Sequence, residues 1–170
     1  TGNAGWARFS LALEGLEINE KYSFSKKGFE AVRKPDATEA AGIIVDDINA
    51  DRTGSWRMST RRSNHIGDHY LADDNKNTGD YAITWKAKLP KPGTYEVRVS
   101  FGGGEGLART APYRVRHAEG ETELSVNQRQ KPSIVGLWFP LGRFTFDRSA
   151  EVSLSNKDAG GWVIADAMQL

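Results

Sequence analysis

The sequence predicts an all-β protein, and more narrowly an antiparallel, jelly-roll-like β-sandwich with extra N-terminal strands or a linker. Three observations lead to this fold class. Apolar and polar residues alternate with period two in many short segments, and glycine, proline, asparagine or aspartate separates these segments. Beyond Gly42, no stretch of about twelve residues carries an apolar stripe with the helical repeat of 3.6.

Two neighbouring segments show the alternation most clearly. In residues 81–89 the apolar face includes Ile83 and Trp85, and in residues 94–101 it includes Val97 and Val99. The sequence between them, PKPG, is typical of a turn. We therefore expect the two strands to form a hairpin.

The other predicted strands are shorter and are separated by similar turns. They cover residues 43–47, 111–117, 122–128, 141–146, 151–155 and 162–170. Gly160 and Gly161 lead into the last one. Because the terminal strands of sandwich domains often pair, we expect residues 43–47 to lie beside residues 162–170.

Residues 1–42 have a different pattern and are predicted to be an N-terminal extension, or the end of a preceding module with a linker. Residues 6–13 alternate, and residues 16–24 suit a partner strand. Residues 31–40 are polar with one proline, which favours a linker or a short helix. The beginning of the chain has no signal-peptide pattern, so we expect it to be part of a longer protein.

Composition excludes several classes of function. Lys plus Arg is 23 and Asp plus Glu is 22, a net charge of +1, which argues against a dedicated nucleic-acid binder. The absence of cysteine excludes thiolate nucleophiles, CxxC redox motifs and thiolate zinc sites. No apolar run approaches the ~18 residues of a membrane span, so we expect no transmembrane segment.

Three carboxylates are candidates for a metal site. Asp46 and Asp47 end the first strand of the sandwich, and Asp166 lies among apolar residues of the last strand. If these strands pair, the carboxylates meet, and oxygen-only ligands suit Ca²⁺. The alternative is that the side chains hydrogen-bond to nearby loop backbone, as buried carboxylates generally must. The sequence leaves both interpretations open.

The first long loop carries the candidates for ligand binding. Trp56, Arg61, Arg62, His65 and Tyr70 combine aromatic faces, which stack on sugar rings, with guanidinium groups, which hold carboxylates or sulfates in bidentate fashion. The alternative places Trp56 in the core and the arginines on a solvated rim. Arg109 and Trp138 are further candidates outside this loop.

Other motifs give weaker predictions. The glycine-rich loop 102–106 resembles a phosphate cradle, but a strand rather than a helix is predicted after it. A metal cluster of His65 and His69 with nearby aspartates is a further alternative. Sequence alone places no acid–base pair or activated nucleophile, so we expect no catalytic activity.

Several motifs in order resemble a known family: GIIVDD, LPKPGTYEVRVSF, VNQRQKP, WFPLGRFTFD and GGWVIADAMQL. Over residues 43–170 the chain is similar to the golvesin-type, xanthan-lyase carbohydrate-binding-like domain family. The resemblance implies a small β-sandwich at the end of a secreted or cell-surface bacterial polysaccharide-processing protein. Such domains also follow FAD-dependent oxidoreductase domains, and the last motifs are especially similar to those copies.

Two functions follow as expectations. The first is a carbohydrate-binding accessory module for an anionic polysaccharide, uronic-acid-containing or sulfated, joined to a catalytic domain of the same parent chain. The second is a structural module without a sugar site, which packs on that catalytic domain through Trp138 and the N-terminal strands. The resemblance transfers no agreed set of sugar-binding residues to this chain.

Overall fold

The computed structural model describes residues 22–24, 31–33 and 42–170. The chain divides into two compact units, residues 1–34 and residues 35–170. In the first unit, β1 (Tyr22–Phe24) pairs antiparallel with β2 (Ala31–Arg33). The prediction of a linker or helix from residue 31 is therefore wrong for residues 31–33, where pairing with β1 gives a strand in a polar segment. The strand predicted at residues 6–13 lies outside the described residues, and the domain boundary at residue 42 stays a prediction.

The second unit is built almost wholly of strands. In chain order they are β3 (Ile44–Asp46), the 3₁₀ turn η1 (Asp47–Asn49), β4 (Asp51–Thr53), β5 (Arg57–Ser59), β6 (Tyr70–Ala72), β7 (Ala82–Lys88), β8 (Gly93–Ser100), β9 (Ala111–His117), β10 (Gly120–Val126), β11 (Trp138–Phe146), β12 (Ser149–Ser155), β13 (Ile164–Ala165) and β14 (Ala167–Gln169). No helix in the described part of the chain is long and apolar enough to cross a bilayer.

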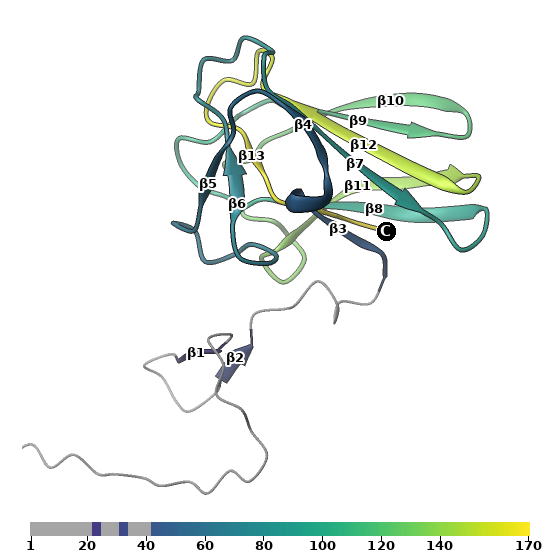
Figure 1. Ribbon diagram of the computed structural model, residues 1–170, viewed down its shortest axis with the longest axis horizontal. Helices are drawn as coiled ribbons and strands as arrows, with labels where there is room; N and C mark the ends of the chain where they lie inside the picture. Colours follow the sequence, from purple (N-terminus) through teal and green to yellow (C-terminus); the bar gives the residue numbers. More distant parts are fainter. Residues whose placement is uncertain (1–21, 25–30, 34–41) are drawn as a thin grey trace, which may run out of the picture. The chain divides into compact units, whose positions relative to one another are not determined.

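These strands form three sheets in the second unit. One sheet has the order β10-β9-β12-β7-β4, and a second has the order β11-β8-β14-β3. The two stack as the layers of a sandwich, and a small sheet of order β13-β6-β5 lies at one end (Figure 1). Every pairing between these strands is antiparallel. The predicted antiparallel β-sandwich is confirmed.

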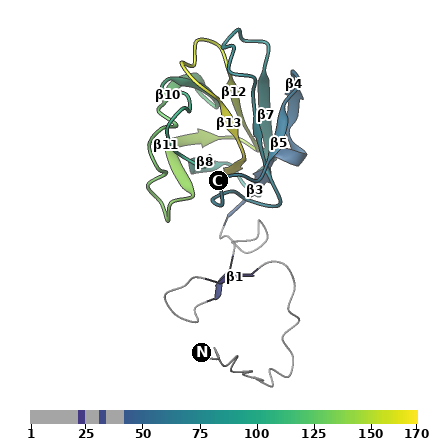
Figure 2. The ribbon, with the colours of Figure 1, turned by 90° about the vertical axis from the view of Figure 1, so that its left-hand side faces the viewer.

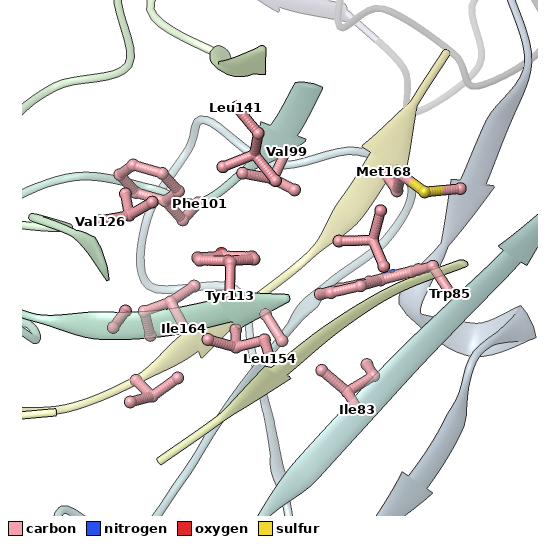
Figure 3. Close-up of a cluster of buried hydrophobic side chains, with 14 of the residues drawn as sticks. Ile83, Trp85, Val99, Phe101, Tyr113, Val126, Leu141, Leu154, Ile164 and Met168 are labelled. Atoms are coloured by element: carbon pink, nitrogen blue, oxygen red, sulfur yellow. The ribbon is translucent and has the colours of Figure 1, made fainter. Parts of the chain in front are cut away.

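Large apolar side chains from both layers fill the space between the sheets (Figure 3). Trp85, Tyr113 and Phe101 are among the largest fully buried side chains. Because full burial of a large apolar side chain contributes about 1.5–3 kcal/mol, a core of this size holds the loops without a disulfide.

The predicted hairpin of residues 81–89 and 94–101 is wrong. β7 pairs with β12 and β4, whereas β8 pairs with β11 and β14 in the other sheet. Residues 89–92 therefore carry the chain from one layer to the other. The apolar alternation showed correctly which side chains point inward, but it says nothing about which strand lies alongside.

The predicted pairing of the first and last strands of the domain is confirmed. β14 pairs with β3, so Ala167 lies opposite Asp46, and Ile43 and Leu170 exchange backbone hydrogen bonds of 2.9 Å. Figure 2 shows the C-terminus beside β3. The last strand is interrupted, however: β13 joins the small sheet and β14 joins the second sheet. Asp166 lies at this change of sheet.

Candidate functional site

A depression of about 800 Å³ lies beside the small sheet. Among its lining residues are Arg57, Arg61, Arg62, Tyr70, Glu105 and Trp162, and we call it the arginine depression. The short strands β5, β6 and β13 supply one wall, and the loop between β8 and β9 supplies another. The site thus joins segments from three distant parts of the sequence.

The three arginines of the depression have no carboxylate partner among the described residues. Three arginines outside the depression do have such a partner: Arg98 contacts Glu96 at 2.8 Å, Arg114 contacts Glu123 at 2.6 Å, and Arg116 contacts Glu121 at 2.8 Å. Glu105 is the one acidic residue that lines the depression. The depression therefore carries a positive charge that the near-neutral composition conceals.

Arg62 joins the two walls of the depression. Its Nη1 donates to the carbonyl oxygen of Gly103 at 2.5 Å and is 3.5 Å from that of Gly102. A Cβ on Gly102 would lie 2.6 Å from Cδ of Arg62, so glycine permits this close approach. The glycine-rich loop leads into β9 rather than a helix, which leaves out the helix N-terminus that a phosphate cradle uses.

Trp162 was not among the predicted site residues, yet it forms part of the depression. Its backbone N–H donates to Gly106 O at 3.1 Å, and its carbonyl accepts from Ala108 N–H at 2.7 Å, so its backbone is held against the loop between β8 and β9, and its ring is half-buried. The guanidinium carbon of Arg57 lies 4.9 Å from the ring centroid, in cation–π contact. The sequence signal was an aromatic residue directly after a glycine pair.

Among the predicted residues, the depression brings together Arg61, Arg62 and Tyr70. Arg61 is exposed and Arg62 is half-buried. Tyr70 is buried, and its hydroxyl accepts a hydrogen bond of 3.0 Å from Ser59 Oγ. The tyrosine is thus held in place by the adjacent strand.

The other predicted binding residues do not line the arginine depression. Trp56 is half-buried against the core, and its Nε1 donates to Thr53 O at 2.8 Å. His65 is buried, Arg109 is exposed, and Trp138 is 4% exposed in a small cluster with Ile66 and Leu137. Because the ring of Trp138 is covered, it offers no face for stacking on a sugar and no contact for another domain.

The three predicted carboxylates do meet. One oxygen from each of Asp46, Asp47 and Asp166 lies within 4.8 Å of the others, and we call these residues the carboxylate cluster. Asp166 accepts hydrogen bonds at both oxygens from the N–H of Ile66, at 3.2 and 3.1 Å, and another from Ser100 Oγ. Of the two interpretations that the sequence left open, hydrogen bonding to nearby loop backbone therefore applies to Asp166.

Asp47 has a different environment from Asp166. It is fully buried, and neither carboxylate oxygen has a hydrogen-bond donor in the described structure. His69 Nε2 lies 3.2 Å from Oδ1 without hydrogen-bond geometry, so this contact is an ion pair only when the imidazole carries a proton on both nitrogens. Within the described residues, His65 does not join His69 in a metal-ligand cluster.

Burial and like charges favour the protonated form of the carboxylate cluster. Burial, together with the charge of Asp46, raises the pKa of Asp47 to about 7, against a smaller opposing effect of Arg52. Burial also raises the pKa of Asp166 well above its usual value, although Ser100 and Ile66 donate to it. Three adjacent carboxylates are thus costly to keep ionised without a cation.

Comparisons with known proteins agree with this architecture. Residues 43–170 match the Golvesin C-terminal domain family. A xanthan lyase from Bacillus sp. (strain GL1) is 32% identical over 143 residues, which cover 79% of this chain and 15% of the relative. The chain therefore spans only a small part of that relative.

Solved structures give the same result. A Paenibacillus xanthan lyase superposes with a TM-score of 0.69 and 27% identity, over 74% of this chain and 12% of that one. The Podospora anserina GH26-CBM35 β-(1,4)-mannanase gives a TM-score of 0.54 at 11% identity, over 76% of this chain and 27% of that one, a likeness of fold alone. On the sequence match and the shared fold, the chain belongs to the Golvesin C-terminal domain family.

Proposed function

We propose that this domain is a non-catalytic carbohydrate-binding module of a larger secreted or cell-surface bacterial polysaccharide-processing protein, and that the arginine depression binds an anionic glycan. The observation that carries the proposal is the set of three arginines, Arg57, Arg61 and Arg62, that surround one depression without a carboxylate partner among the described residues. The sequence relationship to a xanthan lyase supports the polysaccharide as ligand class.

The chemistry of the lining favours a uronic-acid-containing or sulfated chain. A guanidinium group binds a carboxylate or sulfate through two parallel hydrogen bonds, and each such charge-assisted bond is stronger than a neutral one. Arg57 is already held over the ring of Trp162, so less side-chain freedom is lost when it meets an anion. Trp162, which is half-buried, supplies aromatic surface beside these charges, whereas Tyr70 is buried in the wall of the depression.

The same lining supports binding without catalysis. Glycoside hydrolysis generally needs two carboxyl groups on opposite sides of the scissile bond. Among the residues that line the depression, Glu105 is the one carboxylate. We therefore assign the chemistry to a catalytic domain of the parent chain and the glycan contact to this domain.

Affinity electrophoresis against a panel of polysaccharides tests the proposal. The panel contains xanthan, a polyuronate, a sulfated glycan and a neutral glucan. We expect retardation by the acidic members and little by the neutral one, with the effect reduced by added salt. Equal mobility on every gel refutes the proposed function.

A structural module that packs on a catalytic domain, of the FAD-dependent oxidoreductase type for example, is the second candidate. It is favoured by exposed apolar side chains, because Ile48 is 66% and Val135 86% exposed. Trp138 no longer supports this function, since its ring is buried within the domain. Unchanged tryptophan fluorescence with every glycan, together with burial of Val135 in the parent protein, favours this second function.

A further inference from the structure

The carboxylate cluster has the geometry of a shared ion site. Its three ligand atoms lie within 4.8 Å of one another. Ca²⁺ binds oxygen at about 2.3–2.6 Å, so two ligands on opposite sides of one ion are separated by up to about 5 Å. A single calcium ion therefore reaches all three carboxylates, whereas Mg²⁺, with bonds of about 2.0–2.1 Å, needs the set to contract.

Asp47 supplies an independent indication that a ligand is missing from this cluster. Its side chain is fully buried, Oδ1 meets only the ion-pair partner His69, and Oδ2 has no polar partner among the described groups. A buried carboxylate without hydrogen bonds is strongly unfavourable unless a cation or a proton compensates it. One oxygen of this carboxylate lies within 4.8 Å of an oxygen of Asp46 and of Asp166.

The cluster also contacts the segment between Arg62 and Tyr70, two residues that line the arginine depression. The N–H of Ile66 donates to Asp166, and His69 pairs with Asp47. Gly67 has φ +61° and lies so close to Asp46 that a Cβ there would be 2.4 Å from Oδ2. Residues 66–69 thus touch all three carboxylates.

The same loop continues directly into the depression on both sides. Arg61 and Arg62 precede Ile66 by only a few residues, and Tyr70 follows His69. One short segment of the chain therefore joins the carboxylate cluster to side chains that line the depression.

We propose that Asp46, Asp47 and Asp166 bind one Ca²⁺ ion, and that this ion fixes residues 60–70 in the conformation that forms the arginine depression. The ion replaces the repulsion among three neighbouring carboxylates with attraction, and so draws β3, η1 and the change of sheet at Asp166 together. The effect on glycan affinity rests on the proposed function, whereas the binding of calcium does not.

Calorimetric titration of the full, EDTA-treated and dialysed chain with CaCl₂ alone tests the site. We expect saturable binding of one ion per chain and a rise of several degrees in the unfolding temperature at saturation. Asp47→Asn removes one ligand charge but also repulsion, so we expect it to fold in EDTA and to show no calcium-induced rise. Asp51→Asn, an exposed aspartate on β4, is the matched control and should respond to calcium as the parent chain does.

Hydrogen exchange tests the second half of the inference without any glycan. Calcium should slow exchange of the backbone amides in residues 60–70 of the parent chain but not of Asp47→Asn. No heat of binding, an unchanged calcium response in Asp47→Asn, or Mg²⁺ binding as tight as that of Ca²⁺ would overturn the calcium site. Calcium binding without slower exchange in residues 60–70 would overturn the link to the depression, and neither result depends on whether a glycan binds.

Discussion

Replacement of Gly161 by alanine should strongly destabilise the domain. Gly161 has φ +152°, and an added Cβ would lie 2.4 Å from the carbonyl oxygen of Leu107 and 2.9 Å from that of Gly106. These are backbone atoms, so no side chain can rotate away. The strained backbone conformation costs about 1–3 kcal/mol.

The clash also separates the two segments that form this part of the depression wall. The hydrogen bonds from Trp162 N–H to Gly106 O and from Ala108 N–H to Trp162 O join these segments, and each contributes about 1 kcal/mol. We therefore expect Gly161→Ala to lower the free energy of unfolding by about 3–5 kcal/mol in total. Weaker glycan binding should accompany this loss, because Trp162 and Gly106 line the depression.

Gly160→Ala is the matched control for this prediction. Gly160 also has a positive φ, +67°, but the nearest atoms to an added Cβ are 3.8 and 3.9 Å away. Only the left-handed conformation is penalised there, by about 1–2 kcal/mol. Urea unfolding of both variants measures the difference. Equal losses in the two variants, or a loss below about 1 kcal/mol in Gly161→Ala, would refute the steric reasoning.

Three further predictions concern charge and hydrogen bonding. Asn156→Ala should lower the free energy of unfolding by about 3 kcal/mol in urea titrations, because the buried amide accepts hydrogen bonds from the N–H groups of Gly79 and Tyr81 and donates one to Asp73. A loss under about 1 kcal/mol would contradict this prediction. In EDTA, the contribution of Asp47 to the free energy of unfolding should be fully present below about pH 4 and be lost as the pH rises through about 7, since burial raises the pKa of this carboxyl group in the folded state. The measurement is the difference in free energy of unfolding between the parent chain and Asp47→Asn, which should fall by at most about 1.4 kcal/mol per pH unit; a difference that stays flat or rises with pH would count against the prediction. Arg62→Met should weaken retention on acidic gels with only about 1 kcal/mol lost in thermal unfolding, because its guanidinium group donates to loop carbonyls at a half-buried position; retention equal to that of the parent chain would argue against its role.

Much of the fold could be predicted because period-two alternation reports directly which side chains are buried. Ile83, Trp85, Val97 and Val99 all lie in the core as the pattern predicts. The sheet to which a strand belongs depends on contacts between distant segments. The alternation is the same whether β7 and β8 share a hairpin or face each other across the core.

The carboxylate cluster was partly predictable, and the depression was less so. Asp46 and Asp166 meet because terminal strands pair, a rule that sequence order alone supplies. The depression depends on a small sheet whose strands are two or three residues long, too short for a clear periodic pattern. Trp162 begins a predicted strand and Trp138 begins an observed one, so their places in the sequence do not distinguish them. Tertiary packing places Trp162 in the lining of the depression and buries Trp138 inside the domain.

Calorimetric titration with an acidic oligosaccharide tests the central claim most directly, through two double variants with the same change in charge. Arg57→Ala with Arg61→Ala removes two unpaired guanidinium groups from the depression, whereas Arg114→Ala with Arg116→Ala removes two that are paired with glutamates on the exposed face of the sheet. We predict that the first double variant loses binding at least tenfold and that the second binds as the parent domain does. Equal affinity of the two double variants would contradict the assignment of the arginine depression as the glycan site.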